Sequence, residues 1–179
     1  FDFAFLSIIP MLALYLPLPC SMAKLVHINI SNGGVPKLPI QEARIEWLGI
    51  VGDKQKDKRY HGGPLRAICI FSLEIIEKLQ NEGHTIFPGS TGENLTISID
   101  DFASLTPGKK IQIGKDVLLE ITSYTAPCKT IKRSFLNELF IRISHKLYPG
   151  ESRLYAKVLQ TGTVAIGDSV TIHNNEASK

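Results

Sequence analysis

Short runs of β-branched and other apolar residues recur along most of this chain, and they constrain its fold more than any other feature. Gly, Pro, Asn or Asp residues separate the runs, which is typical of short strands joined by turns. So many short strands in one chain favour a closed or nearly closed β-barrel. The predicted strands are Leu25–Ile30, Glu42–Leu48, Arg66–Phe71, Asn94–Ile99, Lys110–Ile113, Val117–Ser123, Leu154–Leu159 and Ser169–His173.

Two segments have a helical rather than a strand pattern. The first is Leu73–Gln80, with Ser72 as the N-cap and Gly83 as the terminator. The second runs from near Cys128 to about Lys146. It is predicted to be a helix because its apolar residues are spaced for one helix face. The sequence therefore predicts a mainly β fold with two helices. Tight hairpin turns are expected at residues 113–116 and 160–163.

The first 21 residues differ in composition from the rest of the chain. They are almost wholly apolar, contain three prolines and no Lys or Arg, and lack the basic region of a secretory signal. Met22 then precedes a convincing strand. We expect residues 1–21 to be an upstream extension, with a membrane anchor as the alternative, and residues 22–179 to form one domain.

Charge and cysteine content exclude several classes of function. The net charge is only +3, with no long basic run, which favours a small anionic ligand over nucleic acid. The three cysteines form no Cys-x-x-Cys pair, so iron–sulfur clusters and structural zinc have no support. An odd cysteine count fits a reducing compartment, and we expect a cytoplasmic protein that does not associate with membranes.

Cys128 stands at the junction between a predicted strand and the second predicted helix. Backbone N–H groups at a helix start favour an anion, which would lower the pKa of the thiol and make a thiolate available as a nucleophile or metal ligand. Lys129, Lys132 and Arg133 follow it, either as part of a site or as a solvated basic face. Cys69 lies within an apolar run and is predicted to be a buried, inert thiol.

Two glycine-rich segments are further candidate sites. Adjacent glycines allow close backbone approach to a ligand, and their N–H groups can surround an anion. The segment Phe87–Leu95 offers Glu93 and Asn94 as ligand contacts, with simple turn chemistry as the alternative. The other segment, residues 49–66, is either a binding loop or a turn with incidental charges. Its candidate residues are Asp53, Arg59, His61, Gly62, Gly63 and Arg66.

Familiar catalytic signatures are absent from the sequence. There is no phosphate-binding P-loop, no dinucleotide fingerprint, no Gly-x-Ser-x-Gly elbow and no His-x-x-x-His pair. A Cys/His hydrolase or acyl transferase remains open, because Cys128 could meet His61 or His145 in space.

The order of these motifs resembles that of the MOSC domain, the module at the C-terminus of molybdenum cofactor sulfurases that also occurs as a stand-alone protein. The resemblance covers about residues 24–173. One departure is Leu65, where many relatives carry an acidic residue. The resemblance rests on Gly49…Gly52-Asp53, His61-Gly-Gly-Pro…Arg66-Ala67, Pro88-Gly…Gly92-Glu-Asn-Leu95, Pro127-Cys128…Ile131 and Tyr155-Ala-Lys-Val-Leu…Gly162…Gly167-Asp168.

The resemblance implies a β-barrel that binds the molybdenum cofactor, with Cys128 as the thiolate ligand of molybdenum. It also implies either sulfur handling at the metal or reduction of N-hydroxylated compounds. We expect Arg66, the Gly62–Gly63 backbone and nearby lysines, including Lys129, to hold the cofactor phosphate, and Asn94 or Asp53 to orient groups beside the metal.

Partner proteins follow from what the chain lacks. A reductase of this kind would take electrons from a redox partner, because no flavin, haem or iron–sulfur motif is present. A sulfur-handling protein would need a separate cysteine desulfurase, because no pyridoxal phosphate site fits in this chain. The alternative is a non-catalytic carrier that delivers sulfur or cofactor to an acceptor enzyme.

Overall fold

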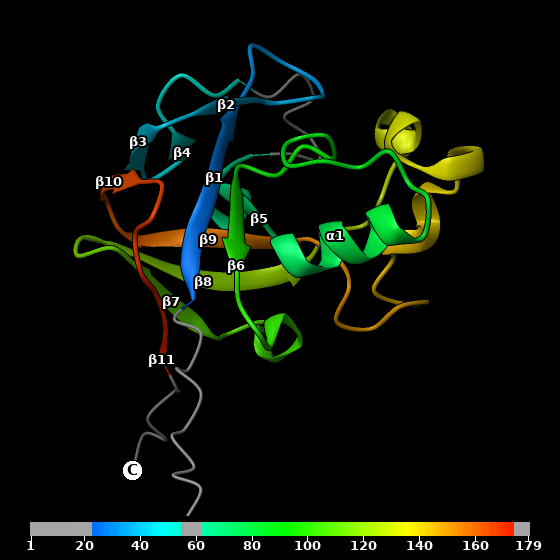
Figure 1. Cartoon of the computed structure of the whole chain (residues 1–179). Coiled ribbons are helices and arrows are strands. Elements are labelled where there is room, and N and C mark those ends of the chain that lie inside the picture. The colour runs from blue at the N-terminus through cyan, green and yellow to red at the C-terminus, as the bar shows by residue number, and fades with distance from the viewer. Residues whose placement is uncertain (1–22, 55–61, 174–179) are drawn as a thin grey trace, which may run out of the picture.

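Two β-sheets form the fold, as seen in a computed structural model that describes residues 23–54 and 62–173. The larger sheet is mostly antiparallel, and the smaller one has three strands (Figure 1). In spatial order the larger sheet contains β11 (Val170–His173), β7 (Lys110–Ile113), β8 (Val117–Tyr124), β9 (Leu154–Gln160), β5 (Ile68–Ser72), β6 (Leu95–Ser98), β1 (Lys24–Ile30) and β2 (Leu38–Ile40). The smaller sheet contains β10 (Gly162–Ala165), β3 (Glu42–Glu46) and β4 (Gly49–Ile50).

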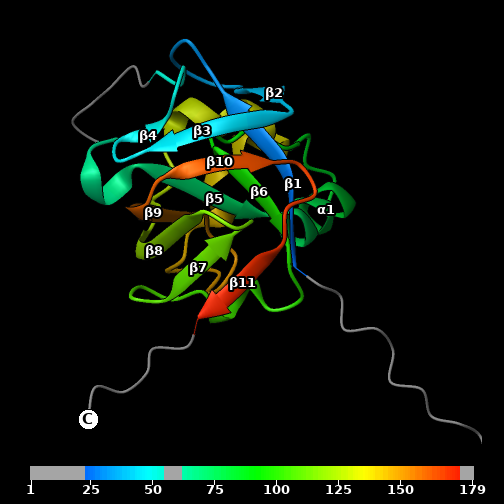
Figure 2. The same ribbon diagram turned by 90° about the vertical axis from the view of Figure 1, so that its left-hand side faces the viewer.

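The two sheets share one apolar core. Ile45 of β3 and Val164 of β10 belong to the same buried cluster as the central strands of the larger sheet, and Figure 2 shows the small sheet lying against it. Within the larger sheet, Leu95, Ile70 and Leu154 stand side by side in register and are buried. Burial of these branched side chains is the main stabilising term of the fold.

The helix α1 (Leu73–Asn81) connects the parallel pair β5 and β6, which needs a crossover rather than a hairpin. The Ser72 side chain accepts a hydrogen bond from the Ile75 N–H (3.2 Å), which confirms the predicted N-cap. Ile75, Ile76 and Leu79 form the buried face of the helix.

The second predicted helix is helical only in short pieces, so the expectation of one continuous helix is wrong. The segment forms three 3-10 helices, η3 (Lys129–Ser134), η4 (Leu136–Glu138) and η5 (Phe140–Ile143). Asn137 and Glu138 have positive φ, which an α-helix does not allow. The Leu136 N–H donates to His84 Nδ1 (2.9 Å), so a tertiary contact takes a backbone donor from the segment.

Two further short 3-10 helices complete the described elements, η1 (Pro64–Arg66) and η2 (Phe102–Ser104). Arg66 was predicted to begin a strand, but it lies in η1. The observed strand β5 begins at Ile68. The predicted hairpin at 113–116 joins β7 to β8 and is confirmed. The one at 160–163 is wrong, because β10 leaves β9 to pair with β3 in the other sheet.

The mainly β class is confirmed, but a closed barrel is not. Among the described residues neither sheet closes through a continuous ladder. The larger sheet is nevertheless strongly curled, because residues near its two edges exchange a few backbone hydrogen bonds. Leu25 N–H donates to the Asp168 carbonyl (2.9 Å), and Val170 N–H donates to the Ala23 carbonyl (2.8 Å).

In the described part of the chain, no helix has the length and apolar character needed to cross a membrane. The predicted extension, residues 1–21, lies outside the described residues.

Replacing Glu74 by Gln tests the link between α1 and β6. Burial raises the pKa of Glu74, but hydrogen bonds from Ser72, Ser98 and the Ile99 N–H outweigh it and leave the pKa below the ordinary value. Losing these charge-assisted bonds should cost about 1–2 kcal/mol of unfolding free energy at neutral pH.

The contribution of Glu74 to the free energy of unfolding should depend on pH. Because the folded pKa is lowered, the stabilisation is fully present above the unfolded pKa and is lost as the pH falls through the folded value. Urea unfolding should therefore show the difference between Glu74→Gln and the parent shrinking in acid. Glu77→Gln, on the exposed face of the same helix, is the matched control; equal losses in both variants would contradict this account.

Candidate functional site

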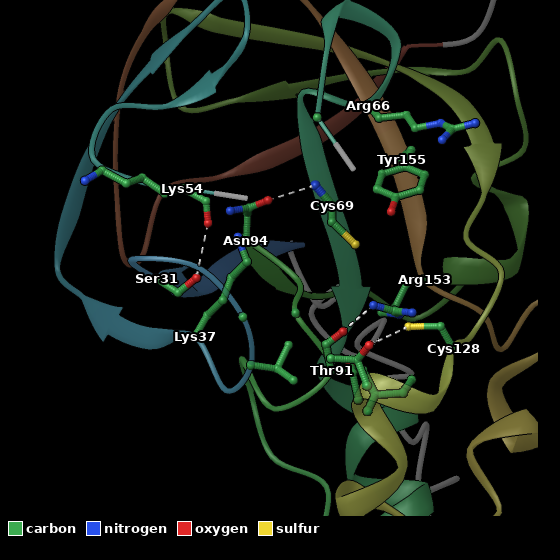
Figure 3. A pocket seen from close by; sticks show the side chains of 16 residues that line it. Ser31, Lys37, Lys54, Arg66, Cys69, Thr91, Asn94, Cys128, Arg153 and Tyr155 are labelled. Carbon is green, nitrogen blue, oxygen red and sulfur yellow. Dashed lines mark hydrogen bonds between the residues drawn. The ribbon is translucent and has the colours of Figure 1, made fainter. Parts of the chain in front are cut away.

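A pocket of about 560 Å³ lies beside the strands β5 and β9 of the larger sheet (Figure 3). Its walls come from segments far apart in the sequence: the loop after β1, the segment after β4, the loop around η1, the strand β5, the loop before β6, the start of η3 and the start of β9. The lining residues are Ser31, Gly34, Val35, Lys37, Lys54, Gly62, Arg66, Cys69, Thr91, Gly92, Asn94, Cys128, Thr130, Ile131, Arg153 and Tyr155.

Strand alternation explains why β5 and β9 supply polar groups to this pocket. Cys69 pairs with Tyr155 across the two strands, between the buried pairs Ile68–Ala156 and Ile70–Leu154. Successive side chains on a strand point to opposite faces, so Cys69 and Tyr155 point away from the face of those neighbours, and both line the pocket. The Arg66 guanidinium carbon lies 5.8 Å from the centre of the Tyr155 ring, within the range of a cation–π contact.

Cys128 occupies the N-cap position of η3 and is only partly buried. Its thiol donates to Thr130 Oγ1 (3.3 Å) and caps no backbone N–H group. The predicted position at a helix start is therefore correct, but the helix is a six-residue 3-10 segment. Such a short helix has little macrodipole, so the exposure of the sulfur to the pocket matters more than the helix behind it.

The second thiol in the pocket wall has a different environment. Cys69 is 5% exposed, and burial raises the pKa of its thiol, with Arg153 opposing the shift. Cys69 is thus buried as predicted and stays protonated, although its position in the pocket wall was not predicted. Of the two thiols, Cys128 is the one suited to ligate a metal.

Asn94 connects the pocket wall to the sheet. Its side-chain amide donates to Asp53 Oδ2 (2.9 Å) and to the Asn29 carbonyl (3.3 Å), and its oxygen accepts from the Cys69 N–H (3.2 Å). Asp53 in turn holds the Lys37 ammonium group in a buried ion pair and accepts from the Ser31 N–H (2.8 Å). These contacts tie β5, β6 and the loop after β1 together.

Gly89 allows the loop before β6 to approach that wall closely. It has φ +87°, and a Cβ atom there would lie 2.5 Å from the Lys37 carbonyl oxygen. The Lys37 N–H donates to the Gly89 carbonyl (2.9 Å). A larger residue would separate the two segments, so the glycine is required by packing as well as by its backbone conformation.

The structure brings together four of the predicted site residues. Gly62, Arg66, Asn94 and Cys128 line the pocket. The Asp53 carboxylate, with a side chain 1% exposed, lies behind the wall and supports it. Gly63 and Lys129 are exposed and are not part of the lining. Arg59 and His61 lie outside the described residues.

Two other sequence-based expectations concern residues that are not part of the lining. Leu65 is 61% exposed, so the departure from the family pattern there does not alter the pocket wall. His145 stacks on Tyr124 with the ring centres 3.4 Å apart. It therefore does not supply the pocket histidine that a Cys128/His145 hydrolase would need.

Sequence reasoning missed Lys37, Arg153 and Tyr155 as pocket residues. Arg153 directly precedes β9 and is 4% exposed, and its guanidinium donates to the Thr91 carbonyl. A basic residue immediately before an apolar strand was the available signal. Burial raises the pKa of Tyr155, so its hydroxyl remains protonated at neutral pH.

The described lining residues include four cations and no carboxylate. Lys37 is neutralised by Asp53, and the other cations of the described lining are Lys54, Arg66 and Arg153. Within the described ranges, no group of three or more His, Cys, Asp and Glu side chains is arranged to hold a metal. The pocket suits an anionic ligand, with one accessible thiol beside it.

Replacing Asn94 by Ala should destabilise the fold by about 3 kcal/mol, because it leaves several buried donors and acceptors without partners. Ser31→Ala is the control, since it also changes the pocket lining but removes only two exposed hydrogen bonds, to the Lys54 carbonyl (3.5 Å) and from the Gly33 N–H (3.2 Å). Urea unfolding should separate the two variants clearly. Similar unfolding free energies would show that Asn94 does not hold the wall.

Comparisons with known proteins agree with the fold. The structure is similar to that of YuaD from Bacillus subtilis, with a TM-score of 0.70 and 22% identity, covering 87% of this chain and 97% of that one. It is also similar to YiiM from Geobacillus stearothermophilus, with a TM-score of 0.68 and 21% identity, covering 85% of this chain and 75% of that one. At these identities the likeness establishes the fold alone.

In sequence, the chain is 24% identical over 142 residues to the uncharacterized protein YflK of Bacillus subtilis (strain 168). That match covers 78% of this chain and 62% of YflK, so the chain spans less than two thirds of that relative. The profile of the MOSC domain matches residues 57–171, which is more than half of the chain. The chain therefore belongs to the MOSC domain family, which is associated with molybdenum cofactor binding.

Proposed function

We propose that the pocket binds the molybdenum cofactor through Cys128, and that the loaded protein reduces N-hydroxylated compounds. The single observation that carries this proposal is an accessible thiol in a basic pocket of about 560 Å³. A soft thiolate suits a molybdenum centre, and surrounding cations suit a pterin cofactor that carries a phosphate.

The residues present fit this group in three respects. Cys128 is partly exposed and Cys69 is buried and protonated, so only the first is available as a thiolate ligand. Lys54 and Arg66 are exposed at the opening, where they can hold the phosphate. Gly92 lines the cavity with φ +87°, and a Cβ atom there would lie 3.1 Å from Val35, so the glycine keeps space for a ligand.

The bound cofactor would supply a redox-active, Lewis-acidic metal. The chain's own residues would position the reactants around it. Cys128 holds the metal, and the Asn94 network keeps the opposite wall in place. Tyr155 keeps its proton at neutral pH and can donate a hydrogen bond to an oxygen atom of the substrate.

Electrons for the reduction would come from a partner protein, because the sequence has no flavin, haem or iron–sulfur motif. A carrier of cofactor or sulfur would use the same pocket and the same thiol. The two functions differ in turnover, which an assay can measure.

Cys128→Ser should lose molybdenum while keeping the fold, because a serine hydroxyl is a much harder and less acidic ligand. We would measure the molybdenum and pterin content of the whole chain, purified from a host that makes the cofactor. Cys69→Ser is the matched control and should retain about one equivalent of metal. Full molybdenum content in Cys128→Ser would refute Cys128 as the ligand.

The loaded protein should reduce amidoximes or hydroxylated bases when an artificial electron donor is supplied. Product formation that disappears in Cys128→Ser would support the reductase. Stoichiometric cofactor binding without turnover, together with transfer to an apo-enzyme, would instead assign the carrier function.

A further inference from the structure

Arg153 is the pocket residue that the proposed cofactor contacts leave without a role. It lies directly before β9, lines the pocket and is 4% exposed. A guanidinium buried to this extent has lost most of its hydration, which costs several kcal/mol unless negative partners replace the water. The partners of Arg153 therefore indicate what the pocket is built to hold.

In the described part of the chain, Arg153 has too few hydrogen-bond and charge partners to replace the lost water. Arg153 donates from Nη1 to the Thr91 carbonyl, while its buried Nε has no hydrogen-bond partner. No ion pair between described residues includes it. The buried carboxylate of Glu93 accepts from the Gly89 N–H and from Thr91 Oγ1 (2.7 Å).

The remaining carboxylate of this wall is also engaged, because Asp53 is paired with Lys37. Arg153 thus carries a buried positive charge that no ion pair between described residues compensates, and its side chain lines the cavity. A ligand with an oxyanion would compensate this charge, since a guanidinium can bind two oxygen atoms side by side.

The position of Arg153 identifies the part of the ligand that it would meet. Arg153 and Cys128 both line the pocket, and Figure 3 shows the two side chains among its labelled residues. Gly92 lies against the Arg153 guanidinium: a Cβ atom there would be 3.8 Å from Nη1. A group bound by Arg153 would therefore lie in the same cavity as whatever is held at Cys128.

We propose that Arg153 binds a negatively charged group of the substrate, a carboxylate or a similar oxyanion, while the reacting nitrogen–oxygen bond lies beside Cys128. The substrates would then be compact N-hydroxylated compounds that also carry an acidic group. The anion site rests on the geometry of Arg153, whereas its assignment to such substrates rests on the proposed function.

The anion site can be tested without the cofactor. Calorimetric titration of the whole, cofactor-free chain with benzoate and with benzamide compares two probes of similar shape that differ in charge. The parent should bind benzoate about tenfold or more tightly than benzamide, and Arg153→Gln should abolish that preference. Lys157→Gln, which removes a charge from the adjoining strand β9 at a partly exposed ion pair with Glu120, should keep that preference.

A second variant covers the case in which Arg153→Gln does not fold. Arg153→Lys keeps the charge but not the two-pronged donor, so its preference for benzoate should fall severalfold without vanishing. An unchanged preference in either folded variant would overturn the anion site.

Cofactor content distinguishes the two sources of an anion. Molybdenum and pterin contents of Arg153→Gln equal to those of the parent support the assignment to substrate. Loss of pterin in that variant overturns it, because Arg153 would then hold the cofactor phosphate. If the parent itself contains no molybdenum but shows the Arg153-dependent preference, the proposed function fails while the anion site stands.

Discussion

The buried polar network around Asn94 is the interaction on which the pocket depends. One amide side chain joins the backbone of β5, the end of β1 and the carboxylate of Asp53, which in turn fixes Lys37. In a low-dielectric interior such a network is strong when every member is satisfied and costly when one member is removed. It holds the loop after β1 against the sheet, and this leaves a cavity between that loop and the Cys128 segment.

The electrostatics of the cavity follow from how this network uses its charges. Asp53 forms an ion pair with Lys37, and the Glu93 carboxylate accepts hydrogen bonds within its own loop, so no described carboxylate faces the cavity. The remaining cations give it a positive potential that suits an anionic cofactor or substrate. The two thiols have separate roles because burial keeps Cys69 protonated while Cys128 is accessible.

Much of the fold could be predicted from the sequence, because alternation and turn residues act locally. Most of the longer strands and α1 lie where the pattern places them. The segment after Cys128 could not be predicted correctly, since its apolar spacing is helical but its backbone is diverted by the contact between Leu136 and His84. The path from β9 into β10 was missed for a similar reason: a Thr-Gly pair is compatible with a hairpin, and only pairing with β3 decides otherwise.

The candidate site shows the same division. Cys128, Arg66 and Asn94 stand in glycine-marked or junctional segments, and the sequence pointed to them. Arg153 and Tyr155 flank an ordinary apolar strand, and Cys69 lies inside one, so their shared pocket appears only once β5 and β9 pair. Asp53 was expected to orient groups beside the metal. Its role as a support of the wall could not be predicted, because its partners Lys37 and Asn94 are distant in sequence.

X-ray absorption at the molybdenum edge of the purified, loaded protein tests the central claim most directly, because it counts the sulfur atoms bound to the metal. The account predicts one sulfur ligand more than the pterin dithiolene provides, contributed by Cys128. A spectrum explained by the dithiolene sulfurs alone, with only oxygen or nitrogen as further ligands, would contradict it.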